Sequence, residues 1–137
     1  MFVTTFKLRV RYAETDQMGY AYYGTYSTYF EVARVEALRS LGIRYADMEA
    51  NGIMLPVRDV SIRYRRPLKY DSLFTVTTEI PKLPEGSRLF FRYQIHDEAG
   101  ELCTEAETTL VFASTETGRP VAPPRNVLEA LAPFFTE

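Results

Sequence analysis

The spacing of the apolar residues is the feature that most constrains the fold of this chain. The apolar residues recur every two residues at first, then about every 3.6 residues, and then every two residues again. Over residues 6–12, apolar side chains alternate with Lys and Arg, which is typical of a strand with one buried face and one wet face. From Tyr26 to Leu41 the apolar residues recur at helical spacing instead. Gly42 follows at a position where the end of a helix favours glycine. The chain therefore predicts a strand followed by a long helix.

Four more segments alternate in the same way after this helix. They are joined by short connections rich in Pro, Gly and Asp, as antiparallel strands are, and they cover residues 57–66, 74–80, 88–96 and 105–112. One apolar helix and one sheet with a single apolar face can bury each other. We therefore predict an α+β fold in which a five-stranded antiparallel sheet wraps around one long helix. Residues 43–52 are predicted to form a second helical turn and a loop, and residues 127–135 a short terminal helix.

The length and charge of the chain narrow the class of protein. With 137 residues we expect one domain, residues 1–137, that is large enough to bury a core. The formal net charge of −2 argues against nucleic acid as a partner, because nucleic-acid binders carry a basic excess. Cys103 is the single cysteine, which fits a reducing compartment. No apolar run is long enough for a membrane span, so we expect a cytoplasmic protein.

The loop between the first strand and the long helix carries the candidate chemistry. Asp16 lies on this loop between two rigid elements, and Gly19 permits a tight turn. Gly24 lies near the expected helix start, where the first N–H groups have no partner within the helix. A carboxylate near free N–H donors can attack a carbonyl, or activate water, while the donors stabilise the oxyanion. The same residue pattern also occurs in simple turns and caps, and the pattern alone leaves both interpretations open.

Five tyrosines follow this aspartate. Their periodicity assigns Tyr26 and Tyr29 to the core. The same argument leaves Tyr20, Tyr22 and Tyr23 undecided between core and substrate pocket.

The residues of this segment match a known signature. They are Tyr12, Thr15, Asp16, Gly19, Tyr23 and Tyr26, continued in the helix by Phe30-Glu31. The segment resembles the 4-hydroxybenzoyl-CoA thioesterase family of hotdog-fold proteins, and the similarity covers nearly the whole chain. The resemblance implies hydrolysis of an acyl- or aroyl-CoA to the free acid and CoA. It makes Asp16 the nucleophile or general base, and it makes the backbone N–H of Tyr23 the group that polarises the thioester carbonyl.

The resemblance also implies where the substrate lies. Coenzyme A enters as part of the substrate, and neither a metal nor a redox cofactor is required. The pocket is expected between subunits, in a homodimer or a homotetramer built as a dimer of dimers. The expected substrate-binding residues are Gly19, Tyr22, Gly24 and Thr25 near the carboxylate, and Lys82, Ser87 and Arg88 at a turn resembling the phosphate-contacting region of relatives.

Further basic residues could contact the phosphates of coenzyme A, although alternating Arg on the outer face of a sheet is usually a solvated surface. These candidates are Arg63, Arg65, Arg66 and Lys69. Two departures from the family pattern matter. Thr25 stands where many relatives have Asn, and Tyr23 stands where one branch has His, so no imidazole role carries over.

Two other functions remain open at this stage. A hotdog hydratase or dehydratase would need a catalytic histidine, and the single histidine, His96, lies on the polar side of its strand. A non-catalytic acyl-thioester binding protein would not need a carboxylate at position 16. His96 and Cys103 are too few ligands for a zinc site, and no nucleophile elbow is present for a serine triad. Glu14 and Glu31 could act as a second carboxylate, but we expect them to form ion pairs with Arg.

Overall fold

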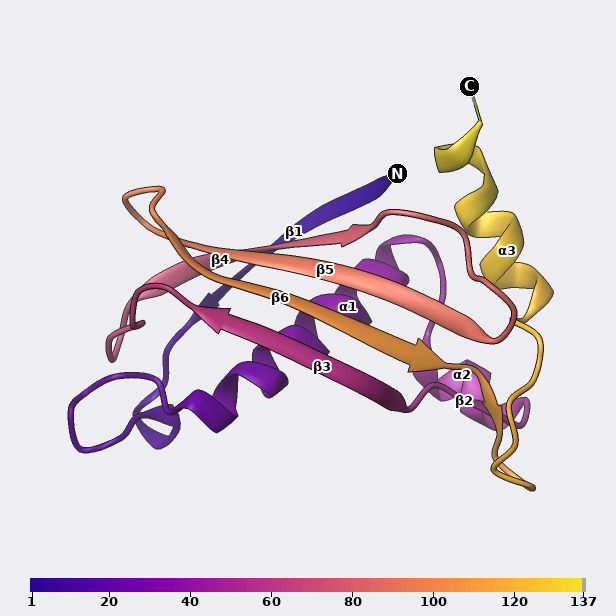
Figure 1. The fold of residues 1–137 in the computed structure, drawn as a ribbon, viewed down its shortest axis with the longest axis horizontal. Coiled ribbons are helices and arrows are strands. Elements are labelled where there is room, and N and C mark those ends of the chain that lie inside the picture. The colour runs from indigo at the N-terminus through magenta and orange to yellow at the C-terminus, as the bar shows by residue number, and fades with distance from the viewer. Residues whose placement is uncertain (137) are drawn as a thin grey trace.

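A computed structural model describes residues 1–136 and has the predicted layers: a curved antiparallel sheet with one long helix against its inner face (Figure 1). The sheet has the strand order β1-β4-β5-β6-β3. Its strands are β1 (Phe2–Arg9), β3 (Val57–Tyr64), β4 (Leu73–Ile80), β5 (Arg88–Asp97) and β6 (Leu102–Val111). The helices are α1 (Tyr26–Ser40), α2 (Tyr45–Ala50) and α3 (Arg125–Leu131). This arrangement is the hotdog fold.

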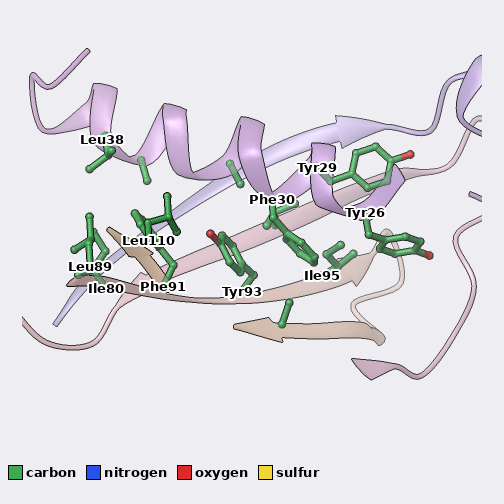
Figure 2. Packing of buried hydrophobic residues seen from close by; sticks show 14 of the residues in the cluster. Tyr26, Tyr29, Phe30, Leu38, Ile80, Leu89, Phe91, Tyr93, Ile95 and Leu110 are labelled. Carbon is green, nitrogen blue, oxygen red and sulfur yellow. The ribbon is translucent and has the colours of Figure 1, made fainter. Parts of the chain in front are cut away.

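The core lies between α1 and the sheet. Figure 2 shows Phe30 pointing from α1 toward Tyr93 of β5, and the two ring centroids are 4.6 Å apart. Ala33 and Ala37 are completely buried on the same face, so the backbone of α1 can approach the sheet closely. The burial of Tyr26 and Tyr29 confirms their assignment to the core.

The end of α1 differs slightly from the prediction. The helix stops at Ser40, and Leu38 rather than Leu41 is fully buried. The chain then reverses at Gly42, whose φ of +83° favours glycine as predicted.

The first strand lies nearer the N-terminus than predicted, at Phe2–Arg9 rather than at residues 6–12. It ends at Arg9, and Tyr12 lies in a 3-10 turn (Tyr12–Glu14) with 79% of its surface exposed. The physical reason is local: the Glu14 side chain accepts a hydrogen bond from the Arg11 N–H at 2.8 Å and closes a turn, which ends the strand.

The predicted buried face of β3 is also partly wrong. Val60 is 49% exposed and Tyr64 is 46% exposed, although both have the parity of core residues. Because β3 is an edge strand, it has one neighbour, β6, and α1 approaches β1 and β4 on the opposite side of the sheet more closely than it approaches β3. An open apolar edge is usual for a sheet that pairs with another chain.

The remaining elements of the fold are short. A two-residue ladder, β2 (Ile53–Met54) with β7 (Ala113–Ser114), was too short for periodicity to predict. The terminal helix was predicted, but α3 starts at Arg125 and continues as a 3-10 turn (Ala132–Phe135). Within residues 1–136, no helix has the length and apolar character needed to cross a membrane.

Candidate active site

The loop that carries Asp16 is held on both sides by backbone hydrogen bonds. The Ala21 N–H donates to the Leu68 carbonyl at 2.7 Å, and the Tyr70 N–H donates to the Gly19 carbonyl at 2.8 Å. Gly19 has a φ of +78°, the left-handed conformation that glycine adopts readily. The loop is therefore fixed to the segment before β4 rather than left free in solvent.

The two carboxylate oxygens of Asp16 have different surroundings. Oδ1 accepts hydrogen bonds from the N–H groups of Met18, at 2.9 Å, and Tyr20, at 3.3 Å. No hydrogen bond or ion pair to Oδ2 is made by any group of residues 1–136. The half-buried side chain lines a hollow of about 330 Å³. Asp16 is thus a turn residue through one oxygen, and its other oxygen is available to a molecule in the hollow.

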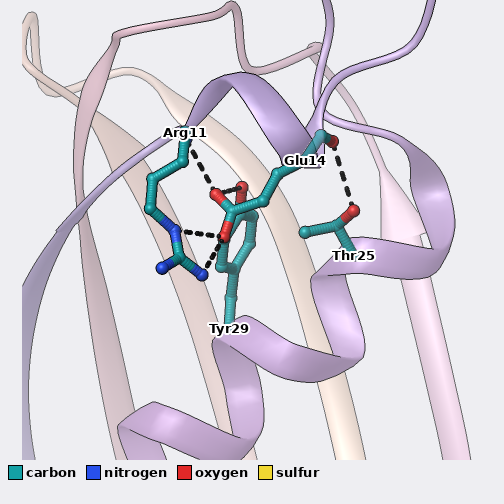
Figure 3. Close-up of polar contacts among 4 residues, drawn as sticks. All are labelled: Arg11, Glu14, Thr25 and Tyr29. Atoms are coloured by element: carbon teal, nitrogen blue, oxygen red, sulfur yellow. Dashed lines mark hydrogen bonds and ion pairs between the residues drawn. The ribbon is translucent and has the colours of Figure 1, made fainter.

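Glu14 fastens the same loop to α1 (Figure 3). Its carboxylate accepts hydrogen bonds from the Arg11 guanidinium at 2.9 Å and from the Tyr29 hydroxyl at 3.0 Å. Its backbone carbonyl accepts hydrogen bonds from Tyr22 N–H at 2.8 Å and from Thr25 Oγ1 at 3.2 Å. The expected pairing of Glu14 with an arginine is confirmed, and the hydroxyl of Thr25 serves the loop itself.

The charge of Glu14 is stabilised by these donors. Burial raises the pKa of the Glu14 carboxyl, but the Arg11 N–H, the Arg11 guanidinium and the Tyr29 hydroxyl together lower it below its ordinary value. Burial and the hydrogen bond to this carboxylate raise the pKa of Tyr29, so that its hydroxyl remains a donor. Glu14 is therefore an anchoring carboxylate rather than a second base in the hollow.

The start of the helix presents backbone N–H groups beside this loop. A 3-10 turn (Tyr23–Thr25) leads into α1, and no group of residues 1–136 accepts a hydrogen bond from the Tyr23 N–H. The Tyr23 carbonyl accepts a hydrogen bond from the Tyr64 hydroxyl at 3.1 Å, which ties this turn to the end of β3. A free N–H at a helix start can polarise a carbonyl oxygen.

Gly24 lies close to the aromatic ring of the exposed Tyr22. A Cβ atom at this position would lie 2.9 Å from a ring carbon of Tyr22. The rings of Tyr22 and Tyr23 lie with centroids 4.6 Å apart, and both are exposed. These two tyrosines are therefore surface residues at the helix start, whereas Tyr20 is half-buried and lines the hollow.

The hollow has aromatic walls and a basic rim. Besides Asp16 it is lined by Met18, Tyr20, Ala21, Tyr23, Tyr26, Tyr64, Arg65, Arg66 and Pro67. Arg65 pairs with Glu105 at 2.8 Å, and Arg66 lies 3.8 Å from Glu101, so both cations are held at the rim. Arg63 instead lines a depression on the other face of the sheet, with Arg92 and Gln94.

The residues expected at the phosphate end lie elsewhere in the protomer. Lys82, Ser87 and Arg88 follow β4, whereas the Asp16 loop packs beside the start of β4 (Figure 1). The strand between them spans roughly 23 Å at 3.3 Å per residue. Lys82 pairs with Glu85 at 2.9 Å, and the Ser87 carbonyl accepts the Phe112 N–H at 2.8 Å. One protomer therefore does not bring these three residues together with Asp16.

Other candidate groups remain apart. Residues 1–136 contain no cluster of three or more potential metal ligands, and Cys103 is buried. Glu31 is exposed and forms no ion pair within the described part of the chain, so the expected pairing with an arginine is wrong for this residue.

Sequence reasoning missed two residues beside α1. Tyr64 has the parity of a core residue, and nothing in the pattern indicates that its hydroxyl reaches the helix start. Arg34 lies on the polar arc of the predicted helix but is buried. Its burial depends on the packing of other elements, so no local signal identifies it.

Comparison with known proteins fits this architecture. Residues 10–131 match the model of the thioesterase-like superfamily. YneP of Bacillus subtilis (strain 168) is 37% identical over 121 residues, which are 88% of this chain and 87% of YneP. YbgC of Haemophilus influenzae, an acyl-CoA thioesterase, is 30% identical over 129 residues, which are 92% of each chain. A crystal structure of DHNA-CoA thioesterase from Staphylococcus aureus has a TM-score of 0.92 and 36% identity, and covers 98% of this chain and 91% of that chain.

The sheet, the long helix and these relatives define the class of protein as a hotdog thioester hydrolase. The chain belongs to the thioesterase-like superfamily. The resemblance noted in the sequence is thus confirmed at the level of this superfamily.

Proposed function

We propose that the protein hydrolyses acyl-CoA or aroyl-CoA thioesters to the free acid and CoA, with Asp16 as the catalytic carboxylate. One observation carries this proposal: Asp16 lines a hollow beside the start of α1, and its Oδ2 accepts no hydrogen bond from any group of residues 1–136. The relatives named above as acyl-CoA and DHNA-CoA thioesterases support the choice of a CoA thioester. The reaction adds water across the bond between the carbonyl carbon and sulfur, so neither a metal nor a redox cofactor is needed.

In this proposal the Tyr23 N–H holds the carbonyl oxygen of the thioester as it gains negative charge. Asp16 then attacks the carbonyl carbon, giving a mixed anhydride that water hydrolyses, or it removes a proton from an attacking water. In both routes the sulfur leaves as the CoA thiolate. The bonds from Met18 and Tyr20 to Oδ1 orient the carboxylate and leave Oδ2 to act.

The remainder of coenzyme A needs basic groups outside this hollow. Arg65 and Arg66 are the basic sequence candidates that line the hollow of Asp16. The turn with Lys82, Ser87 and Arg88 lies too far away in the same protomer, so in this proposal it is contributed by a second copy. The active unit is then a homodimer, or a homotetramer built from two dimers. The cytoplasmic location remains an expectation that rests on the sequence alone.

The test is an assay of thiol release from a panel of straight-chain and benzoyl-type CoA thioesters. We expect Asp16→Asn to lower kcat at least about a hundredfold, because the amide keeps the shape and the hydrogen bonds to Oδ1 but is neither base nor nucleophile. The ratio of kcat/KM between the two substrate classes identifies the acyl group.

A matched control is Asp97→Asn. Asp97 also holds a turn through Oδ1, which accepts the Glu101 N–H at 2.9 Å, but it lies in the β5–β6 turn and does not line the hollow. If Asp16→Asn and Asp97→Asn turn over equally fast, Asp16 is only a turn residue and the proposal fails. A hydratase would release no thiol from any substrate, and a binding protein would protect the thioester.

A further inference from the structure

Arg34 is a buried cation without an anion. Arg34 lies on the inner side of α1 and is 7% exposed. Its Nε is buried and has no hydrogen-bond partner within residues 1–136. No carboxylate within residues 1–136 lies within 4.0 Å of its guanidinium. Arginine stays protonated in proteins, and a buried charge is retained only at a large energetic disadvantage unless it is paired. The missing partner therefore needs an explanation.

Two tyrosines, Tyr45 and Tyr93, lie near the guanidinium, and the carboxylates of Glu31 and Glu49 are close enough to act on Tyr45. Burial raises the pKa of Tyr45 and of Tyr93, and the nearby Arg34 opposes part of that rise. The Tyr93 hydroxyl is already bonded to Thr108 Oγ1 at 2.8 Å, whereas the buried Tyr45 hydroxyl has no partner within residues 1–136. Neither tyrosine supplies a negative charge to the guanidinium.

Arg34 lines a second hollow, of about 250 Å³, between α1 and the edge strand β3. Its apolar walls are Phe30 of α1 and Val57 and Val60 of β3. Its polar lining consists of Arg34, Thr108, Ser27, Thr28 and Glu31. A carboxylate is available on α1, because Glu31 lines the same hollow, but its side chain is exposed and is not paired with Arg34. Apolar walls with one buried cation suit an apolar chain that ends in a negative charge.

The two hollows lie along the same side of α1. Tyr26 lines the hollow of Asp16 and Arg34 lies eight residues later, which is about 12 Å along the helix. Helical side chains lean toward the N-terminus, so the guanidinium is nearer than its backbone. Both hollows are also lined by exposed residues of β3, the first by Tyr64 and the second by Val60. An extended acyl chain of roughly eight to ten carbons spans this distance, since three backbone bonds cover about 3.8 Å.

We propose that the acyl group of the substrate carries a carboxylate at its far end, and that Arg34 binds it. The substrate class is then the CoA monothioester of a medium-length dicarboxylic acid. This inference rests on the proposed function and names the substrate of the same site. Hydrolysis breaks the bond between carbon and sulfur, forms one between carbon and the water oxygen, and yields a dicarboxylate and CoA. A planar guanidinium can hold a carboxylate through two hydrogen bonds, and burial strengthens them.

The first test compares matched substrates by thiol release: adipyl-, suberyl- and sebacyl-CoA against hexanoyl-, octanoyl- and decanoyl-CoA. We expect the parent protein to prefer the dicarboxylic thioester of the best chain length by at least about tenfold in kcat/KM. Arg34→Met should reduce that ratio to about one or below. Arg39→Met is the matched control, because Arg39 is an exposed arginine of the same helix that pairs with Glu36 and lines neither hollow. It should keep the parent ratio.

The second test measures the melting temperature of the unliganded variants at one protein concentration. If Arg34 serves a ligand, Arg34→Met should melt no lower than the parent, because the substitution removes an unpaired buried charge. Suberate should raise the melting temperature of the parent and not that of Arg34→Met. A lower melting temperature or a changed oligomeric state in Arg34→Met would overturn the inference. It would show that Glu31, or a carboxylate of a second copy, pairs with Arg34 in the assembled protein.

The outcomes separate this inference from the proposed function. Equal kcat/KM for the two substrate series, with thiol released from both, overturns the dicarboxylic substrate and leaves the thioesterase intact. The absence of thiol release from every thioester overturns the proposed function and this inference with it.

Discussion

Replacing Glu14 with Gln tests how the loop of Asp16 is held. The Glu14 carboxylate is 10% exposed and accepts hydrogen bonds from the Arg11 N–H at 2.8 Å, the Arg11 guanidinium at 2.9 Å and the Tyr29 hydroxyl at 3.0 Å. Gln keeps one acceptor oxygen at nearly the same position but loses the negative charge. The substitution therefore removes the bonds made to one oxygen and weakens those made to the other, while it keeps the shape of the side chain.

The expected loss of stability follows from these contacts. Hydrogen bonds to charged groups contribute about 1.5–3 kcal/mol, and bonds between neutral groups about 0.5–1.5 kcal/mol. The Arg11 side chain is 76% exposed, so its ion pair with Glu14 adds little. We expect Glu14→Gln to lower the free energy of unfolding by about 1–2 kcal/mol at pH 7. In a domain of this size the melting temperature should fall by about 3–8 °C.

The pH dependence of this loss gives a second, independent check. The pKa of Glu14 is lowered in the folded protein, so its charge stabilises the fold fully above its ordinary pKa of 4.5. That stabilisation is lost as the pH falls below this value and through the lowered pKa. The difference in melting temperature between parent and variant should therefore change by no more than about 1 °C from pH 6 to pH 8. It should shrink below roughly pH 4.

The assay is thermal unfolding of parent and variant followed by circular dichroism at a fixed protein concentration. Glu129→Gln is the control, because Glu129 pairs with Arg125 at 2.8 Å but is 65% exposed, and it should shift the melting temperature by about 1 °C or less. The reasoning is refuted if Glu14→Gln and Glu129→Gln have equal effects. It is also refuted if the difference for Glu14→Gln persists unchanged at pH 3.

Two further substitutions test the helix start and the core. Tyr64→Phe removes the hydrogen bond to the Tyr23 carbonyl. We therefore expect the free energy of unfolding in urea to fall by about 0.5–1.5 kcal/mol and kcat in the thiol-release assay to fall as well. An unchanged kcat would show that Tyr64 does not position the turn. Ala33 has no exposed surface and lies where α1 meets the sheet, so Ala33→Leu inserts a larger side chain into a closed space. We expect the urea midpoint to fall by an amount equivalent to about 1–3 kcal/mol of unfolding free energy. An unchanged midpoint would mean that this contact is loosely packed.

Asp16 shows why a turn residue and a catalytic residue are not exclusive interpretations. The local pattern of a carboxylate before Gly19 predicts a turn, and Oδ1 forms that turn with Met18 and Tyr20. The second oxygen has no partner within residues 1–136, and the hollow that Asp16 lines is formed where β3 and the helix start come together. The sequence predicted the residue and its two possible uses, and the packing of distant segments leaves room for both.

The two tyrosines at the helix start illustrate a different limit. Periodicity assigned Tyr26 and Tyr29 to the core, because residues within a helix obey one spacing. Tyr22 and Tyr23 precede that helix in an irregular turn, where no spacing applies. Their backbone is held by two hydrogen bonds, from the Tyr22 N–H to the Glu14 carbonyl and from the Tyr64 hydroxyl to the Tyr23 carbonyl. Both partners belong to other elements, so the local sequence does not report these bonds or the exposure that follows from them.

The sequence by itself determined the number and kind of the main elements and the loop that carries the carboxylate. Apolar periodicity reports which face of a segment is buried, and glycine and proline report where the chain turns, and both signals are local. Only the tertiary structure decided that β3 is an edge strand with an exposed apolar face, that Tyr64 reaches the Tyr23 carbonyl, and that Arg34 is buried without an anion. These features depend on which distant residues meet, and identical local patterns are compatible with several such pairings.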